Sequence, residues 1–328
     1  MKVLVVLIFI WSIQGLWAQD IIVHDPVVIE QDEQYYLFST GHGISWFSSH
    51  DMKNWKKEEP VFKQAPSWTN TVVPEFKNHI WAPDISFHNG VYYLYYSVSG
   101  FGKNTSAIGL VTNKTLDSAS ENFEWEDQGI VIQSIPNRDL WNAIDPNLIF
   151  DDQNIPWLAF GSFWEGLKLV QLNSDLKTLA QPERWHTIAR RERDFELADT
   201  DPGNAALEAP FIFMKNGYYY LFLSWDLCCR GAESTYKIMV GRSKKVTGPY
   251  VDKQGKSLFN GGGSLILEGD ENWHGLGHNS VYTFGNRDLM FFHAYDANDN
   301  GKPKLRVVEL DWDSEKWPVI LKKEMNKL

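Results

Sequence analysis

Cysteine is scarce in this chain of 328 residues: there are only two, Cys228 and Cys229, and they are neighbours. Neighbouring cysteines cannot link distant segments, so a framework of disulfides is excluded and stability must come from packing. A zinc site is not expected either, because the two thiols lack the usual ligand spacing. The pair can form a strained vicinal disulfide or stay buried and reduced, and we take the reduced form as the expectation.

Basic runs are also missing, as are long apolar segments beyond the first residues. The chain has 31 Lys and Arg against 42 Asp and Glu, a formal net charge of −11. An acidic chain without a basic patch is not expected to bind nucleic acid. A polyanionic substrate would be repelled, so a neutral substrate is favoured. No later segment is long and apolar enough to span a membrane.

The first eighteen residues, MKVLVVLIFIWSIQGLWA, have the pattern of a secretory signal peptide. Lys2 precedes a short apolar run, and Gly15 and Ala18 are small residues near its end. The run is too short for a membrane anchor. We therefore expect cleavage after Ala18 and a secreted or periplasmic protein, with one propeller domain over residues 19–328 and a monomer as the default.

One pattern recurs five times along the chain, which indicates a repeat architecture. A polar step, often with proline, precedes an apolar strand, a turn, and a strand rich in Tyr, Phe and Leu. Turns such as His88-Asn89-Gly90 are typical of hairpins. Each copy leaves room for two more strands, so we predict an all-β fold: a single five-bladed β-propeller with four-stranded blades. A β-sandwich or β-helix has shorter repeats. The residues aligned in the five copies are Asp25, Asp84, Asp145, Glu208 and Asn279.

In a propeller the first strand of each blade lies beside the axis, so the aligned residues are expected to ring one mouth of the channel. Gathering carboxylates there is costly unless they have a task or bind an ion. Glycoside hydrolysis is such a task, because it needs two carboxyl groups on opposite sides of the scissile bond. Asp25, Asp145 and Glu208 are the candidates, whereas Asp84 is expected to cap backbone N–H groups. The insertion Trp185–Leu207 predicts a loop or short helix near the substrate groove.

Aromatic residues make up 14% of the chain, with 15 Trp, and indole rings can stack on the apolar faces of sugars. Eight short motifs in order resemble those of family 43 glycoside hydrolases, in detail the endo-1,5-α-L-arabinanases, over nearly all of the mature chain. They are HDP (24–26), WAPD (81–84), IGL (108–110), NAIDP (142–146), GSFW (161–164), LEAP (207–210), CCRG (228–231) and GHNS (277–280).

The resemblance implies an inverting hydrolase that cleaves internal α-1,5-linked L-arabinofuranosyl bonds of arabinan or arabino-oligosaccharides. Asp25 would be the general base, Glu208 the general acid, and Asp145 would orient the acid and keep its pKa high. His278 would be the position of a metal ion at the propeller axis, with calcium favoured and water completing its shell. The implied substrate-binding residues are Asp25, Trp81, Gly109, Asn142, Ala143, Ile144, Asp145, Ser162, Phe163 and Trp164. Of these, Trp81 would be a stacking platform and Gly109 would allow close approach of the sugar.

Two alternatives stay open at this point. An exo-acting arabinanase, α-L-arabinofuranosidase or β-xylosidase of the same family would follow if the 185–207 insertion closes one end of the groove. A non-catalytic sugar-binding propeller belongs to another class and needs aromatic platforms but no acid–base pair. The presence of all three carboxyl groups argues against the second alternative.

Overall fold

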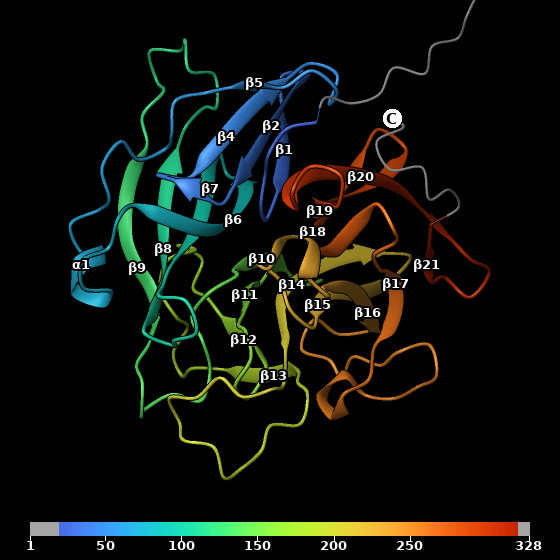
Figure 1. Ribbon diagram of the computed structural model, residues 1–328. Coiled ribbons are helices and arrows are strands. Elements are labelled where there is room, and N and C mark those ends of the chain that lie inside the picture. Colours follow the sequence, from blue (N-terminus) through green and yellow to red (C-terminus); the bar gives the residue numbers. More distant parts are fainter. Residues whose placement is uncertain (1–19, 321–328) are drawn as a thin grey trace, which may run out of the picture.

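Five β-sheets radiate from a central axis in the computed structural model, which describes residues 20–320 (Figure 1). This confirms the predicted five-bladed propeller with four-stranded blades, one of which has an additional short strand. The predicted signal peptide lies outside the described residues. Within residues 20–320, no helix has the length and apolar character needed to cross a membrane.

The blades follow one another along the chain. Blade 1 contains β1 (Val27–Gln31), β2 (Gln34–Ser39), β4 (Ser45–Ser49) and β5 (Lys56–Lys57). Blade 2 contains β6 (His79–His88), β7 (Val91–Val98), β8 (Ser106–Asn113) and β9 (Glu126–Ser134), with the short β3 (Gly41–His42) paired to β6. Blade 3 contains β10 (Asn147–Phe150), β11 (Pro156–Phe160), β12 (Leu167–Gln171) and β13 (Trp185–Ala189).

Blade 4 contains β14 (Leu207–Lys215), β15 (Tyr218–Trp225), β16 (Lys237–Ser243) and β17 (Ser264–Leu267). Blade 5 contains β18 (Trp273–Phe284), β19 (Arg287–Asp296), β20 (Lys302–Trp312) and β21 (Pro318–Val319). The helical elements among the described residues are single turns: α1 (Thr69–Val72), η1 (Gly231–Glu233) and η2 (Leu258–Asn260).

The predicted insertion at 185–207 differs in part from the loop or short helix expected. Its first five residues form β13, the outer strand of blade 3, and residues 190–206 are a loop without helix. A strand forms because Trp185, His186 and Thr187 pair with the edge of β12.

The hydrophobic core lies between the blades rather than within one layer. Strand β15 shows why: Leu221 and Leu223 pack against blade 3, while Tyr220 and Phe222 pack against blade 5. Successive side chains of a strand point to opposite faces, so an apolar run without polar alternation suits a sheet that is covered on both sides. Of the clusters formed by the described residues, one lies between each pair of neighbouring blades.

The start of the described chain closes the ring of blades. The Val23 N–H donates to Pro303 O at 3.3 Å, and the Leu305 N–H donates to Ile21 O at 3.1 Å. Residues 21–23 therefore pair with β20 of blade 5 before the chain enters blade 1, which joins the first blade to the last.

In every blade, a non-glycine residue at an equivalent position in or just before the innermost strand has a left-handed backbone, with φ between 43° and 59°. These residues are Asp25, Ala82, Asp145, Ala209 and His278. They are the true structural equivalents, and the sequence alignment was wrong in three blades. Asp84 lies two residues after its blade's equivalent position, Glu208 one before and Asn279 one after. Alanine rarely adopts a left-handed backbone, so Ala82 and Ala209 are not recognisable as the equivalent positions from sequence. Aligning the acidic residues instead gave the wrong register in these blades.

Candidate active site

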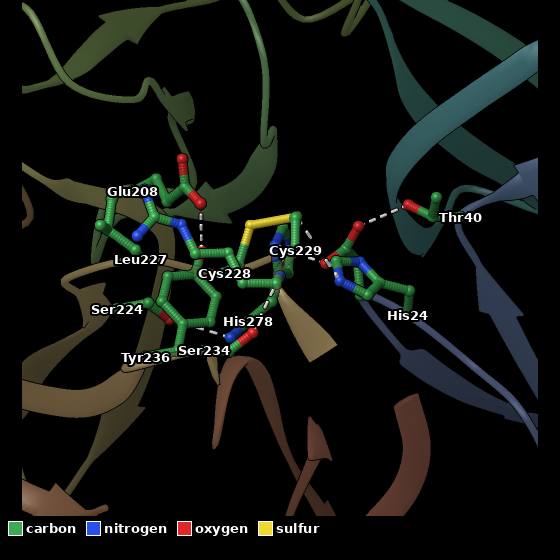
Figure 2. Close-up of a disulfide and its surroundings, with 12 residues drawn as sticks. His24, Thr40, Glu208, Ser224, Leu227, Cys228, Cys229, Ser234, Tyr236 and His278 are labelled. Carbon is green, nitrogen blue, oxygen red and sulfur yellow. Dashed lines mark hydrogen bonds and ion pairs between the residues drawn. A yellow bond between two sulfur atoms is a disulfide. The ribbon is translucent and has the colours of Figure 1, made fainter. Parts of the chain in front are cut away.

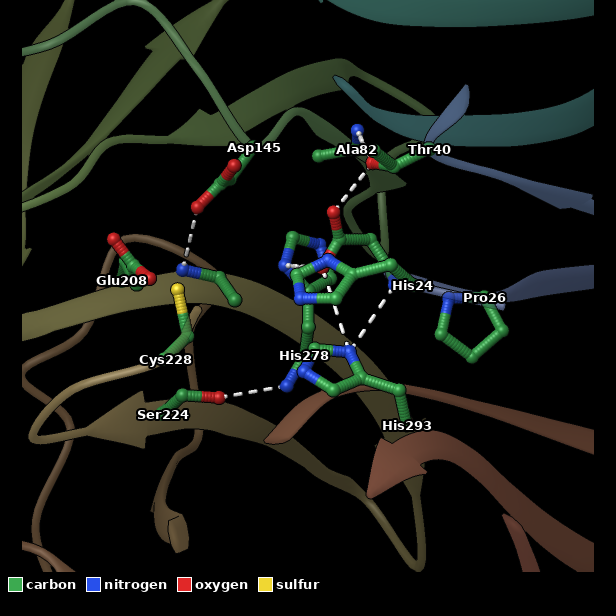
Figure 3. A network of polar contacts seen from close by, with 12 residues as sticks. His24, Pro26, Thr40, Ala82, Asp145, Glu208, Ser224, Cys228, His278 and His293 are labelled. Atoms are coloured by element: carbon green, nitrogen blue, oxygen red, sulfur yellow. Dashed lines mark hydrogen bonds and ion pairs between the residues drawn. The ribbon is translucent and has the colours of Figure 1, made fainter. Parts of the chain in front are cut away.

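One cavity of about 860 Å³ opens at the mouth of the propeller, and its lining contains the three predicted catalytic carboxyl groups. Asp25 and Asp145 lie two residues before the first residues of β1 and β10, and Glu208 lies in β14. Figure 3 shows Asp145 and Glu208 beside one another, with His278 and His24 facing them. Residues from separate blades therefore meet at one site, as expected. Asp84 and Asn279 do not line the cavity. Asp84 instead accepts the Leu148 N–H at 2.8 Å, the capping role predicted for it.

Asp25 is buried among groups that favour its ionised form. Its Oδ1 lies 2.8 Å from His24 Nδ1 and 3.0 Å from His278 Nδ1, and its Oδ2 accepts the Thr40 hydroxyl. Burial alone would raise the pKa of this carboxyl. The charges and hydrogen bonds of His24 and His278 outweigh burial and hold its pKa well below the usual range. Asp25 is therefore a carboxylate at neutral pH.

Glu208 has the opposite character. It is buried, and burial raises the pKa of its carboxyl above the ordinary value, helped by the charge of Asp25. The hydroxyl of Tyr236 donates to Oε1, and Ser162 Oγ donates to Oε2 at 2.9 Å. These two bonds lower the pKa without cancelling the effect of burial. Glu208 thus holds a proton at higher pH than an exposed glutamate.

Asp145 is held next to the acid by the backbone. Its Oδ2 accepts the N–H of Ala209, the residue after Glu208, at 3.1 Å. Burial raises the pKa of Asp145 well above normal, and His278 opposes this while Glu208 and Asp25 add to it. The resemblance attributed the high pKa of Glu208 to Asp145, but the largest cause is burial.

His278 provides positive charge among these acids. Burial lowers its pKa, but Asp25 and Asp145 together raise it to about 9, so the imidazole is protonated at neutral pH. Its backbone N–H donates to Ser224 Oγ at 2.9 Å, which fixes the residue in blade 5 against blade 4. A buried imidazolium reduces the cost of gathering carboxylates in one cavity.

His24 of the HDP motif supports the base together with His293 and Tyr295, which sequence reasoning missed. The His24 ring stacks on His293 with centroids 3.8 Å apart, and His24 Nε2 lies 2.7 Å from the Tyr295 hydroxyl. His293 Nδ1 accepts the Asp25 N–H at 3.2 Å. His293 and Tyr295 are two residues apart and therefore lie on the same face of the apolar strand β19. Such a pair of polar residues in an apolar strand is the signal that could have identified them as part of the site. Tyr236 has no comparable signal in the sequence.

Most of the predicted substrate-binding residues line the cavity. They are Asp25, Trp81, Asn142, Ile144, Asp145, Ser162, Phe163 and Trp164. Gly109 and Ala143 do not. A side chain on Gly109 would meet Tyr96 and Trp68 at 2.5 and 2.7 Å, so the close approach there is made by rings of the chain itself. Ala143 is fully buried in the core between blades 2 and 3.

The loop of residues 190–206 is tied to the cavity wall. Trp164 is 1% exposed, and its Nε1 donates to Asp199 O at 2.8 Å. Arg191 donates to Ala206 O at 3.0 Å and forms an ion pair with Asp226 at 2.8 Å. Pro202 of the same loop lines the cavity. The loop therefore forms part of the wall beside the acid.

Cys228 and Cys229 are joined by a vicinal disulfide, so the expectation of reduced thiols is wrong. Both residues line the cavity, and Cys229 is exposed, so the burial that would have protected free thiols is missing. In Figure 2 the disulfide lies between Glu208 and His24.

Two groups of residues are candidates for a metal site. Atoms of His24, Asp25 and His293 lie within 4.8 Å of one another, but the two stacked rings cannot point their nitrogens at one ion. At His278, Nδ1 faces Asp25, and an ion bound at Nε2 would displace the proton that the ring otherwise carries there. The adjacent Asn279 has both side-chain polar atoms buried without a partner among the described residues, and such atoms need water or an ion. The predicted calcium site at His278 therefore fits the residues present.

Comparison with known proteins gives concordant matches. The model of glycosyl hydrolases family 43 matches residues 20–318. The extracellular exo-α-(1→5)-L-arabinofuranosidase ArbA of Cellvibrio japonicus is 54% identical, covering 94% of this chain and 89% of that protein. The extracellular endo-α-(1→5)-L-arabinanase 1 of Bacillus subtilis is 44% identical, covering 92% and 88%. A structure of Cellvibrio cellulosa α-L-arabinanase complexed with arabinohexaose superposes with a TM-score of 0.91 at 54% identity, covering 92% and 96%.

Proposed function

The chain belongs to glycosyl hydrolases family 43 and is a glycoside hydrolase, an arabinanase; we propose that it inverts the cleaved bond, with Asp25 as general base and Glu208 as general acid. One observation carries this assignment. Two carboxyl groups of the same cavity have pKa values moved in opposite directions, Asp25 downward and Glu208 upward. An acid–base pair requires such a separation.

The proposed reaction uses each group in the state that the structure favours. The Asp25 carboxylate removes a proton from water as the water attacks the anomeric carbon. Glu208 gives its proton to the departing glycosidic oxygen, and the resulting carboxylate is stabilised by hydrogen bonds from Tyr236 and Ser162. Asp145, held by the Ala209 N–H, keeps the acid in place.

Alanine variants of the two acids test these roles. Asp25→Ala and Glu208→Ala should each abolish turnover of linear arabinan while leaving oligosaccharide binding measurable by calorimetry. Glu208→Ala should retain more activity on an aryl arabinofuranoside with a good leaving group, because such a group departs without a proton. If either variant keeps a near-normal rate on arabinan, the assignment is wrong. Inversion is tested by NMR, in which the first product anomer should be β.

For the position of cleavage we propose attack near chain ends, releasing short products of fixed length. The loop 190–206 contributes Pro202 to the cavity and is fixed by Trp164 and Arg191. The Cellvibrio relative named as exo-acting is 54% identical to this chain over the aligned residues, and the Bacillus relative named as endo-acting is 44% identical. The endo-acting enzyme expected from the sequence is the second candidate. Product lengths in the first minutes of arabinan digestion decide: a broad ladder of oligomers supports endo cleavage, and one short product supports exo cleavage.

Two further expectations belong to the same proposal. Both relatives are named extracellular, and the first eighteen residues have the pattern of a signal peptide, so we propose secretion. We also propose that a hydrated calcium ion would take the place of the Nε2 proton of His278, where its charge would stabilise the surrounding carboxylates. N-terminal sequencing and mass spectrometry of the mature protein from the culture medium test the proposed secretion and cleavage.

A further inference from the structure

The vicinal disulfide lies in the loop between β15 and β16, several residues of which line the active-site cavity. The loop runs from Asp226, after β15, to Tyr236, before β16. Cys228 and Cys229 both line the catalytic cavity, and Figure 2 shows them between Glu208 and His24. A bond between adjacent residues closes a small ring that includes their peptide, so it restricts the backbone at this point and nowhere else.

One series of contacts leads from the disulfide to the base. The Cys229 N–H donates to the Tyr295 hydroxyl at 2.8 Å. The same hydroxyl lies 2.7 Å from His24 Nε2, and His24 Nδ1 lies 2.8 Å from Asp25 Oδ1. When Tyr295 donates its proton to Nε2, the Nδ1–H of His24 must point at the carboxylate. The position of Cys229 therefore bears on the orientation of Asp25.

A second series of contacts leads from the same loop to the acid. The backbone N–H groups of Thr235 and Tyr236 donate to Leu227 O at 2.9 and 3.2 Å. Leu227 is the residue before the disulfide, and Tyr236 donates its hydroxyl to Glu208. The hydroxyl of Thr235 also accepts the Leu227 N–H at 3.2 Å. The backbone that carries Cys228 is thus joined directly to the residue that holds the acid.

We propose that the Cys228–Cys229 disulfide is a positioning element of the active site, which aligns Asp25 through Tyr295 and His24 and aligns Glu208 through Tyr236. The inference rests on the proposed acid–base roles. It differs from a general stabilising role, because it predicts a loss of turnover in enzyme that stays folded. It also differs from a simple wall contact with the sugar, which would affect substrate binding rather than turnover.

Reduction with a dithiol such as dithiothreitol tests the proposal on the wild-type enzyme. The dithiol supplies two electrons and two protons, the S–S bond breaks to give two thiols, and the reagent becomes a cyclic disulfide. Because the chain contains only two cysteines, no other protein disulfide can be affected. Thiol labelling measured by mass spectrometry confirms complete reduction, and circular dichroism with a melting curve confirms that the reduced enzyme is folded at the assay temperature.

The expected result is a fall in kcat of about tenfold with KM changed less than about twofold, since small displacements of catalytic groups can reduce rates by up to ~100-fold. Removing the dithiol and reoxidising should restore kcat. The double variant Cys228→Ser with Cys229→Ser should show the same low kcat and no response to dithiothreitol. If the bond resists reduction, this variant, checked for folding in the same way, decides alone. An unchanged kcat in folded, fully reduced enzyme overturns the proposal, as does an effect confined to KM.

Tyr295→Phe tests the route to the base. This variant lacks the hydroxyl between Cys229 and His24, so it should lose part of its kcat, and reduction should cost it less than it costs the wild type. Groups that act through one another are non-additive in this way, whereas independent groups add. Full additivity overturns the proposed route. Failure of the acid–base assignment is separate, because it would appear as activity in Asp25→Ala or Glu208→Ala, whatever reduction does.

Discussion

Tyr236 controls how strongly Glu208 holds its proton. Its buried hydroxyl donates to Glu208 Oε1, and this bond favours the carboxylate and lowers the pKa of the acid. Tyr236→Phe removes the donor but keeps the ring. Glu208 then keeps only the Ser162 hydrogen bond, at 2.9 Å. We therefore expect the pKa of Glu208 to rise further above its ordinary value.

The size of the shift follows from the bond that is lost. A hydrogen bond to a charged group contributes about 1.5–3 kcal/mol, and one pKa unit corresponds to about 1.4 kcal/mol. A shift of about 1–2 units follows, and entry of water into the space left by the hydroxyl places it near the lower value. The general acid works only when protonated, so the alkaline limb of the pH–rate profile should move to higher pH. The plateau rate should fall, because a weaker acid transfers its proton less readily.

The assay is kcat/KM on linear arabino-oligosaccharides between pH 4 and 10, because that quantity reports the free enzyme. Ser162→Ala should move the alkaline limb in the same direction. Tyr250→Phe is the matched control, because it removes a buried hydroxyl, bonded to Val246 O at 2.7 Å, outside the catalytic cavity. It should lower stability by about 1 kcal/mol and leave the pH profile unchanged. An alkaline limb that stays in place or moves to lower pH in Tyr236→Phe refutes the reasoning.

Three further predictions follow from other contacts. Burial raises the pKa of Asp84 to about 7, so the folded protein loses stability as this carboxyl ionises between about pH 4 and 7. Asp84→Asn lacks this loss, so its melting temperature minus that of the wild type should increase between pH 5 and pH 8. A constant difference would contradict the assigned pKa. Trp164→Phe removes the bond to Asp199 O and should lengthen the products of arabinan digestion seen by chromatography, whereas identical products would show that this bond does not restrict the groove. Calcium should raise the melting temperature of the chelator-treated wild type but not of His278→Ala, and equal shifts would place the ion elsewhere.

The architecture was predictable because it depends on repetition. Five hairpins with turn residues such as Asn89 and Gly90, both with positive φ in the structure, separate strands that are apolar on both faces. These features are local, and their spacing determines the number of blades. The catalytic carboxyl groups were predictable from their motifs, and the structure brings Asp25, Asp145 and Glu208 to one cavity.

What escaped prediction depends on contacts between blades. Tyr236 reaches Glu208 because the loop after β15 returns over the cavity, and no local pattern encodes that path. Gly109 and Ala143 belong to motifs of the resemblance, yet they are buried against Tyr96 and within the core. A motif records which residues occur together, but only the packing shows which of them face the cavity.

The backbone pattern of the five blades explains why Asp145 lies beside the acid. In four blades the N–H of the left-handed residue donates to a side chain near the end of the second strand of the preceding blade. These acceptors are Thr40, Ser97, Ser224 and His293. The pairing of Asn147 with Ala159, continued by two residues, places Gly161 opposite Asp145 in blade 3.

Gly161 has no side chain to accept the corresponding N–H of Ala209 in blade 4. A side chain there would also be strained, because φ is 126° and a Cβ would lie 3.1 Å from Gly166 O. Asp145 supplies the missing acceptor, and Ser162 is left to donate to Glu208. An unpaired buried N–H is costly. Because Gly161 cannot accept the Ala209 N–H, Asp145 accepts it and is thereby held next to the general acid. The site therefore lies at the blade boundary where the repeat is broken.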